Sequence, residues 1–348
     1  MKKDLSIEEV KKILKKYSEK IQASKNLFDG ILKEKYIVES GFYDIDIFKD
    51  SVKRITKGIL DTIDNYLDGY PSKAYIRMSN AVRNDKNFDR ILSSRVKTVD
   101  KGSLFYRLRY DADKYFDFPL TPIQLFHVPF HKRHLIKAQR FSIPGYPCLY
   151  LSTTVFTACK EMDIDNIQHN IREIKIAAFR NNAKLRIVDL AAKDISILLK
   201  GLKELKIATL DDKLRDDIYS YGILFPLIAA CHTKIKFRKK TDSHFKPEYI
   251  IPQIILQWFK VNKEMVDGIK YFCNRVNKSE KNGPYDLHNF VFPVQKSKVN
   301  GFCDKLSIYF NGSLVINAKK FTFKKSKLEE RFSELQTALR KSAFVPLK

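Results

Sequence analysis

The chain has 348 residues, of which 44% are hydrophobic and 30% are charged, and its 65 Lys and Arg outnumber its 40 Asp and Glu to give a net charge of +25. This apolar fraction is enough for a packed core, which excludes a disordered, collagen-like or low-complexity chain. The length fits one large domain with a smaller one, or two domains.

Three features bear on the compartment in which the chain works. The apolar run Tyr221–Cys231 has eleven residues, whereas a membrane-spanning helix needs about 20. The N-terminal stretch MKKDLSIEEVKK carries charges where a signal peptide needs an apolar run. The five cysteines form no C-x-x-C motif, which argues against a structural zinc and for a reducing compartment. We therefore expect a cytoplasmic protein without a membrane span.

The positive charge invites a nucleic-acid interpretation, because a positive field attracts any polyanion. The lysines are nevertheless spread along the whole chain. No stretch has the order of an RNA-recognition motif or of a zinc finger. The pattern favours a solubilising surface over specific nucleic-acid binding.

Residues 1–95 are expected to form a helical N-terminal module. A capping box at Ser6 and Glu9 precedes an apolar stripe at helical spacing. A second stripe covers Phe48–Leu67, and a weaker one covers about 72–84. The region has no His, no Cys and no Gly-rich loop, so we interpret it as a packing or docking module.

From about residue 100, short strands alternate with helices. The segment 274–300 is polar and is expected to be a loop. The strands at 174–179 and 185–190 are expected to pair through a turn at Asn181-Asn182. The pattern predicts further strands at 104–109, 148–152 and 266–272, and helices at about 154–162, 192–206, 212–231, 245–261 (from Pro247 or Pro252) and 327–340.

Three histidines lie close together, at His127, His131 and His134. Spacing i, i+4 can bind a metal on a helix, but Pro129 disfavours a helix between the first two. No Asp, Glu or Cys stands nearby. We therefore expect a loop with polar surface histidines and no metal site.

A denser group of candidate residues comprises Arg107, Arg109, Arg140, Tyr150 and Glu161. Taken singly, each is an ordinary surface charge, a half-buried strand residue or an exposed helix position. Taken jointly, two basic side chains near a Pro-Gly turn match the oxygens of a diphosphate. An aromatic side chain at a strand end stacks on a planar ring, and a carboxylate beyond it stabilises a developing cation. Both interpretations stand at this point.

The order of these motifs resembles the RES domain family, toxin-type domains named for Arg, Glu and Ser. The resemblance covers roughly residues 100–275 and is strongest over 104–162, from LFYRLRYDAD through RFSIPGYPCLYLSTTVFTACKEM. It implies an α+β fold, with an ADP-ribosyltransferase-like RES core behind the α-helical N-terminal domain. It also implies consumption of NAD with release of nicotinamide, by hydrolysis or phosphorolysis.

Four residues of this chain match functional positions of the family, and a fifth position departs from the pattern. The family's first arginine matches Arg107, its second basic position matches Arg140, its tyrosine matches Tyr150 and its glutamate, eleven residues later, matches Glu161. The family serine follows a Gly-Ile-x-Tyr strand, where this chain has Cys273. Because cysteine is a weaker hydrogen-bond donor, Cys273 is expected to orient the glutamate or the ribose less well than the family serine.

These matches imply a role for each residue. Glu161 stabilises the oxocarbenium-like ribose, and Tyr150 stacks on the nicotinamide. Arg107 and Arg140 hold the diphosphate, with Ser142 and Ser152 near enough in sequence to the other elements to assist. Together with Cys273, these residues form the expected site, which needs no metal and no cofactor beyond NAD as the substrate.

The sequence thus predicts an NAD glycohydrolase or NAD phosphorylase of the toxin type. One alternative is a transferase of ADP-ribose to a macromolecule, and another is a basic binding protein with an inactive RES-like domain. The expected domains are the helical module 1–95 and a catalytic domain 96–348 with a C-terminal extension from about 276. The family resemblance also implies an antitoxin or other inhibitory partner, whereas the pattern does not favour nucleic acid or a membrane.

Overall fold

The chain forms two compact units, which are described separately. Residues 1–96, 138–142 and 190–262 belong to a helical unit, and the remainder belongs to a sheet unit. The computed structural model describes residues 45–83, 88–110, 121–162, 174–191, 212–233, 245–261, 266–276, 286–317 and 328–347.

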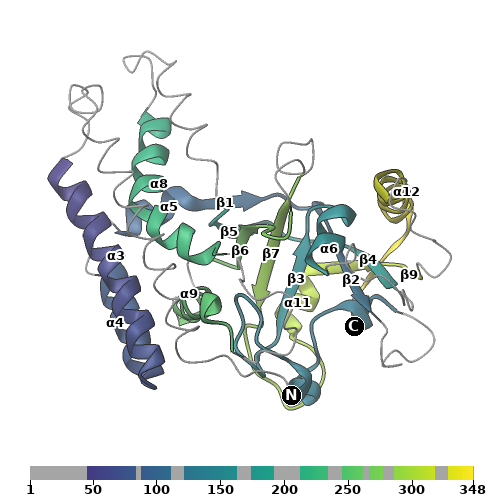
Figure 1. Cartoon of the computed structure of the whole chain (residues 1–348). Coiled ribbons are helices and arrows are strands. Elements are labelled where there is room, and N and C mark those ends of the chain that lie inside the picture. Colours follow the sequence, from purple (N-terminus) through teal and green to yellow (C-terminus); the bar gives the residue numbers. More distant parts are fainter. Residues whose placement is uncertain are drawn as a thin grey trace. The chain divides into compact units, whose positions relative to one another are not determined.

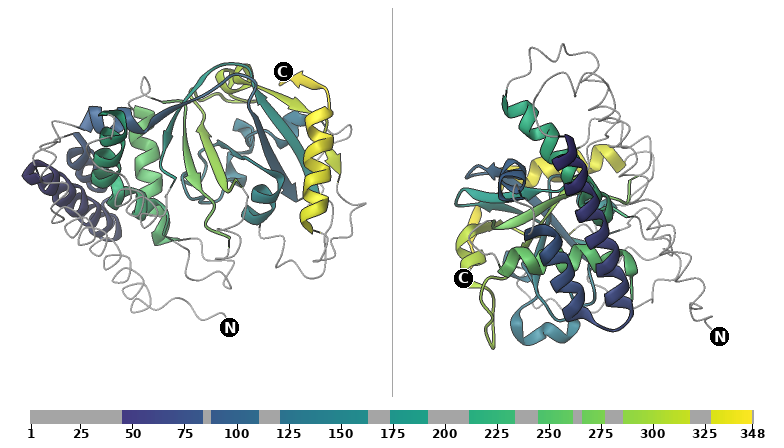
Figure 2. Two further views of the ribbon diagram at one scale, coloured as in Figure 1. Left: turned by 90° about the horizontal axis from the view of Figure 1, so that it is seen from above. Right: turned by 90° about the vertical axis from the view of Figure 1, so that its left-hand side faces the viewer.

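Amphipathic helices make up the helical unit. The apolar stripe expected in Phe48–Leu67 is the buried face of α3 (Ile45–Leu67). Helix α4 (Pro71–Arg83) lies beside α3, as the two purple helices of Figure 2 show. The helices can approach closely at Gly58 because glycine has no side chain. A Cβ atom added there would lie 2.1 Å from the Cβ atom of Ala81. A larger residue at Gly58 would therefore push the two helices apart.

Two apolar helices also belong to the described part of this unit: one packs against α3 and α5 (Phe88–Arg95), and the other against α3 and α4. They are α8 (Asp212–Cys231) and α9 (Ile250–Val261), which follows the short helix η5 (Pro247–Tyr249). A helix that is apolar on nearly all sides needs cover from several neighbours. The helical unit thus has a first segment that ends at Val96, next to the boundary predicted at residue 95, and it also takes in the segment 190–262, which contains α8 and α9.

A ten-stranded sheet dominates the second unit, in the order β1-β5-β6-β7-β3-β2-β4-β8-β10, with β9 paired to β4 (Figure 1). Strand β5 runs parallel to β6, and the pairs from β6 to β10 are antiparallel. Mixed strand directions with helices agree with the predicted α+β class. The strands are β1 (Val96–Val99), β2 (Leu104–Tyr110), β3 (Cys148–Ser152), β4 (Ile174–Asn181), β5 (Leu185–Asp189), β6 (Gly268–Phe272), β7 (His288–Pro293), β8 (Phe310–Ser313), β9 (Ile316–Asn317) and β10 (Phe344–Pro346).

Alternation along the strands divides the core of the sheet unit between two faces. On one face Phe105 packs edge-to-face on Phe290, with ring centroids 5.0 Å apart. This face also meets the short helices η1 (Pro122–Leu125) and η2 (Phe130–Leu135) and helix α11 (Asp304–Tyr309).

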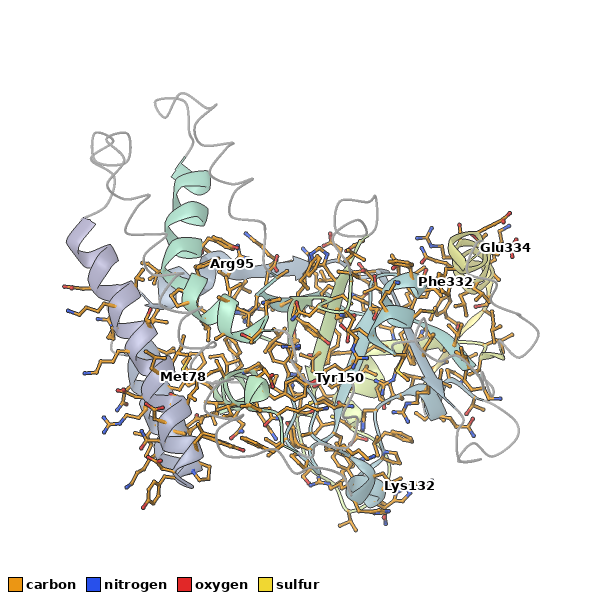
Figure 3. All side chains as sticks on the ribbon, in the orientation of Figure 1. Met78, Arg95, Lys132, Tyr150, Phe332 and Glu334 are labelled. Atoms are coloured by element: carbon orange, nitrogen blue, oxygen red, sulfur yellow. The ribbon has the colours of Figure 1, made fainter. Side chains whose placement is uncertain are left out.

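Helices α6 (Val155–Glu161) and α12 (Leu328–Lys341) pack on the other face of the sheet. Figure 3 labels Phe332 and Glu334 on α12. Phe332 is buried in the core cluster, whereas Glu334 is exposed. The amphipathic pattern expected over 327–340 thus forms a helix whose apolar stripe is buried on this face.

Several predicted elements are confirmed, β3 and α8 with the predicted bounds and α3, α4, β2, α6, α9, β6 and α12 with bounds that differ by a few residues. The helices expected after Ser6 and at 192–206 lie outside the described residues. Among the described helices, none combines the length and the apolar character that crossing a membrane requires.

The expected pairing of the strands at 174–179 and 185–190 is wrong, because β4 and β5 lie in different parts of the sheet. The side-chain amide of Asn181 donates to the carbonyls of Asp100 and Ala183, both over 2.9 Å. Asn182 likewise donates to the carbonyl of Ile308. These bonds turn the chain away from β4, so β5 pairs with β6 instead.

The expected loop at 274–300 is also wrong over its central part. Strand β7 lies between β3 and β6 in the sheet, and Phe290, Val291 and Phe292 are buried. The apolar run is only a few residues long and its flanks are polar, which hid it in the sequence.

Candidate functional site

Glu161 is the last residue of α6, the helix that follows strand β3. Thr154 caps this helix, because its hydroxyl accepts from the amide of Thr157 over 3.0 Å. The buried residues of α6 fix the helix against the sheet. The side chain of Glu161 is 31% exposed, so a substrate can reach it.

A buried amide holds one oxygen of this carboxylate. Asn289 Nδ2 donates to Glu161 Oε1 over 2.7 Å. On its other side, Asn289 Oδ1 accepts from the hydroxyl of Ser152 over 2.6 Å. Asn289 and Ser152 are both buried, so these bonds lie where water competes little.

Cys273 lies against the same carboxylate. Burial raises the pKa of its thiol well above the usual range, and the charge of Glu161 and a hydrogen bond to it act in the same direction. Nε of Arg275 lies 3.9 Å from Glu161 Oε2. The carboxylate therefore contacts an amide on one oxygen, a cation on the other, and a neutral thiol.

The sheet itself aligns the polar side chains near Glu161. Tyr106 of β2 is opposite Ser152 of β3, Ser152 is opposite Asn289 of β7, and Asn289 is opposite Tyr271 of β6. Directly opposite residues in antiparallel strands share a face of the sheet. The four residues thus form a row across neighbouring strands, on the face that α6 covers.

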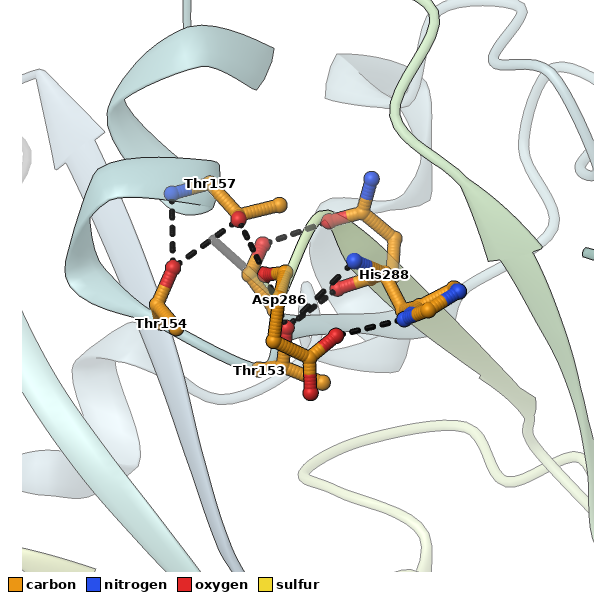
Figure 4. A network of polar contacts seen from close by, with 7 residues as sticks. Thr153, Thr154, Thr157, Asp286 and His288 are labelled. Atoms are coloured by element: carbon orange, nitrogen blue, oxygen red, sulfur yellow. Dashed lines mark hydrogen bonds and ion pairs between the residues drawn. The ribbon is translucent and has the colours of Figure 1, made fainter. Parts of the chain in front are cut away.

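A second network of hydrogen bonds connects the start of α6 with the start of β7 (Figure 4). The hydroxyls of Thr153 and Thr157 donate to the carbonyl of Asp286, over 2.7 and 2.8 Å. The side chain of Asp286 in turn pairs with Nδ1 of His288. These bonds join the start of α6 to the start of β7, and so they set where Glu161 and Asn289 meet.

The two arginines of β2 lie on the opposite side of that strand from Tyr106 and Leu108. Arg107 Nη1 donates to the carbonyl of Tyr150 over 3.1 Å, and Arg109 Nη2 donates to the carbonyl of Phe126 over 2.9 Å. Strand pairing joins β2 to β3 at Tyr106 and Ser152. The guanidinium of Arg107 thus bonds a β3 carbonyl beside that point.

The two guanidinium groups repel each other in a half-buried setting. Burial, followed by the charge of Arg109, holds the pKa of Arg107 well below its usual range. Burial lowers the pKa of Arg109 to about 10. Within the described residues no carboxylate pairs with either arginine. A bound anion would offset this uncompensated charge.

Tyr150 is the half-buried residue at the centre of β3 (Figure 3). Its carbonyl accepts from Arg107. Its side chain points to the face of the sheet opposite the one on which its buried neighbours Leu149 and Leu151 lie. This position presents an aromatic side chain on the face of the sheet that carries Ser152 and Glu161.

Arg140 and Ser142 belong to the helical unit, where the structure gives both of them partners. Arg140 Nη1 donates to the carbonyls of Cys231 and Thr233, both over 3.0 Å, at the C-terminal end of α8. Its guanidinium also lies over the ring of Tyr249. Ser142 is buried and donates to the side-chain oxygen of Gln139. These contacts stabilise the helical unit, and the predicted roles of both residues toward NAD stay predictions.

The expectation of surface histidines is wrong for His127, which is 1% exposed. Its Nδ1 lies 2.8 Å from the carbonyl of Val128, and its Nε2 accepts from the amide of Cys303 over 2.9 Å. These two bonds require the neutral ring with the proton on Nδ1. The described residues hold no cluster of three or more His, Cys, Asp or Glu side chains able to bind a metal ion.

Sequence reasoning missed Asn289 and Arg275 as neighbours of Glu161. Asn289 fell in the segment expected to be a loop, and nothing in its sequence context distinguishes it from other polar residues. Arg275 follows Cys273 by two positions. Its place two residues after the predicted site cysteine was the one available signal.

Comparisons with known proteins give one relative by sequence. No model of a known protein family matches the chain. Over 269 residues it is 29% identical to a Bacillus subtilis (strain 168) protein named "Putative toxin YopC". The match covers 74% of this chain and 57% of that protein, so the chain spans less than two thirds of this curated relative.

Among solved structures, the chain aligns with one from the crystal structure of the M. tuberculosis MbcT–MbcA toxin–antitoxin complex. The TM-score is 0.33 with 10% sequence identity, and the alignment covers 72% of this chain and 98% of that one.

Proposed function

We propose that this chain is a toxin-type enzyme that cleaves the nicotinamide–ribose bond of NAD. The observation that carries the proposal is the environment of Glu161. Its carboxylate is partly exposed, one oxygen is held by a buried amide, and the other lies 3.9 Å from Nε of Arg275. A fixed carboxylate of this kind stabilises positive charge that develops on a sugar ring. The sequence similarity to a protein named as a toxin supports the toxin class.

The reaction places the charge next to this carboxylate. The bond between ribose C1′ and the pyridinium nitrogen breaks, and its electron pair leaves with nicotinamide as a neutral ring. The ribose keeps a positive charge shared between C1′ and the ring oxygen. Glu161 accepts hydrogen bonds from the ribose hydroxyls and lowers the energy of that cation. Water then adds to C1′ and releases a proton to give ADP-ribose, or phosphate adds to give ADP-ribosyl phosphate.

Two further groups bind the substrate in this proposal. Tyr150 stacks on the nicotinamide ring and orients the bond that breaks. Arg107 projects from the side of β2 opposite Tyr106, but its guanidinium reaches the main chain of Tyr150 over 3.1 Å. In this proposal it binds the diphosphate there, and the diphosphate supplies the anion that its half-buried guanidinium lacks. Binding energy from the diphosphate is thereby used to position the ribose against Glu161.

A direct assay tests the proposal. Purified protein is mixed with NAD in the presence and absence of phosphate. The products nicotinamide, ADP-ribose and ADP-ribosyl phosphate are then separated by chromatography. We expect release of nicotinamide by the wild-type protein and little by Glu161→Gln. Absence of nicotinamide release in every buffer would refute the proposal. Release of nicotinamide with the ADP-ribose label recovered on a macromolecule would identify the chain as a transferase.

A further inference from the structure

We propose that Asn289 is a positioning residue for Glu161, and that Ser152 sets the orientation of its side-chain amide. The inference rests on the proposed function, because it concerns how the carboxylate of that site is held. The amide of Asn289 donates to Glu161 Oε1 over 2.7 Å, and the hydroxyl of Ser152 donates to Asn289 Oδ1 over 2.6 Å.

The chemistry of the three groups selects one arrangement. An ionised carboxylate only accepts hydrogen bonds, so the group that faces Glu161 must be the NH2 of the amide. The carbonyl oxygen of the amide then points the other way and needs a donor. The hydroxyl of Ser152 supplies it. Reversing the amide would set its oxygen against the carboxylate and lose that bond, while the Ser152 hydroxyl would have to accept from the NH2 instead of donating.

The hydrogen bonds from Ser152 to Asn289 and from Asn289 to Glu161 are together called the relay. The sheet fixes the spacing of its first two members. Ser152 and Asn289 are directly opposite in neighbouring antiparallel strands, and the Cβ atoms of such pairs lie about 4.5–5.5 Å apart. They are 5% and 2% exposed, respectively. A relay built on paired, buried strands is held more precisely than one built on a loop.

The relay determines which carboxylate oxygen meets the substrate. Oε1 is occupied by Asn289, so Oε2 is left for the ribose hydroxyls. Of the described ionisable groups, Arg275 lies 3.9 Å from Oε2, and the Cys273 thiol faces the carboxylate from the end of β6. The bond to Oε1 fixes the orientation of the carboxylate and therefore the position of Oε2. Without the relay, the carboxylate can rotate about its bond to Cγ.

Two substitutions at Asn289 test the donor. Asn289→Leu keeps the approximate size but removes both polar atoms, and Asn289→Asp replaces the donor with a second carboxyl group. We expect kcat to fall about 10- to 100-fold with a much smaller change in KM, the scale of a misplaced catalytic group. Asn181→Asp is the matched control, because Asn181 is an equally buried strand residue whose amide bonds only main-chain carbonyls.

The pH profile separates positioning from a merely structural role. Two carboxyl groups this close share one proton, and in Asn289→Asp that proton lets position 289 donate to Glu161 as the amide does. The proton is lost as the pH rises, and the two charges then repel. We therefore expect the activity of Asn289→Asp to fall as the pH rises. The wild type and Asn181→Asp should show no such fall.

A substitution at Ser152 tests the orientation of the amide. Ser152→Ala leaves Asn289 in place but removes the donor to its oxygen, so we expect a smaller loss of kcat than in Asn289→Leu. Ser313→Ala is the matched control, because Ser313 is a buried strand serine of the same sheet that bonds main-chain groups of Ala178 and Leu314. It is expected to lower the melting temperature without changing kcat.

A measurement without NAD separates this inference from the proposed function. In a 1H–15N NMR spectrum, the side-chain amide of Asn289, identified by its absence in Asn289→Leu, is expected to exchange slowly with solvent and faster in Glu161→Ala. A wild-type protein inactive on NAD would refute the function, and this exchange would still test the relay. Wild-type kcat and pH profile in both Asn289 variants of an active enzyme, or exchange unaffected by Glu161→Ala, would overturn the positioning role.

Discussion

Cys273 and Glu161 meet although they lie 112 positions apart in the sequence, because the residue that follows β6 and the last residue of α6 lie on the same face of the sheet. Cys273 is fully buried. It therefore combines a core position with a contact to the predicted catalytic carboxylate.

This contact makes the response to substitution at Cys273 specific. In Cys273→Ser the hydroxyl donates to Glu161, so the buried polar group keeps a partner and activity is expected to hold or rise. In Cys273→Val the donor is lost while the bulk is kept, and nicotinamide release is expected to fall at an unchanged melting temperature. Measuring both quantities for both variants decides the matter. A fully active Val variant beside an unchanged Ser variant would remove Cys273 from the site.

Glu161→Gln tests the carboxylate itself. Glutamine keeps the length of the side chain but carries no negative charge to stabilise the ribosyl cation. The turnover rate is expected to fall about 10²-fold or more, the scale of losing one preorganised group. Binding of NAD, measured by calorimetry, and the melting temperature should stay near those of the parent. If the Glu161→Gln variant turned over NAD at the parental rate, the carboxylate would have no catalytic role.

Part of this site was predictable from the sequence, and part was not. The strand at 148–152 and the helix after it were confirmed, because alternation and a capping threonine are local signals. The partner of Glu161 was missed because the pairing of β3 with β7 joins residues 137 positions apart. No local pattern encodes that register. The same limit explains the wrong pairing of β4 with β5, where the turn at Asn181 suggested a hairpin but led to a distant strand.

The arginines of β2 should differ in their effect on substrate binding. A charge-assisted hydrogen bond to a diphosphate contributes about 1.5–3 kcal/mol, so Arg107→Ala is expected to raise the KM for NAD by about 10- to 100-fold. Arg109→Ala is expected to raise it less, because the guanidinium of Arg109 bonds the carbonyl of Phe126 rather than that of Tyr150. Steady-state kinetics of both variants, with melting temperatures as a control, make the comparison. A larger effect at Arg109 would assign the diphosphate to that residue.

His127 predicts how the stability of the protein depends on pH. Burial lowers the pKa of its imidazole to about 4, and the hydrogen bond to Val128 only partly opposes this. The unfolded chain binds a proton at this histidine near its usual value of about 6.5, whereas the folded protein does not. Between those two values the unfolded state holds more protons, so the free energy of unfolding falls as the pH falls.

The substitution His127→Gln removes this titration while keeping an oxygen that can accept from the amide of Cys303. At pH 7 the wild type should be at least as stable as the variant. Between pH 7 and pH 5 its free energy of unfolding should drop relative to that of His127→Gln by about 2 kcal/mol, which follows from one histidine with the two pKa values above. Urea unfolding of both proteins at the two pH values measures the difference. Parallel pH profiles would mean that His127 is not kept neutral by the fold.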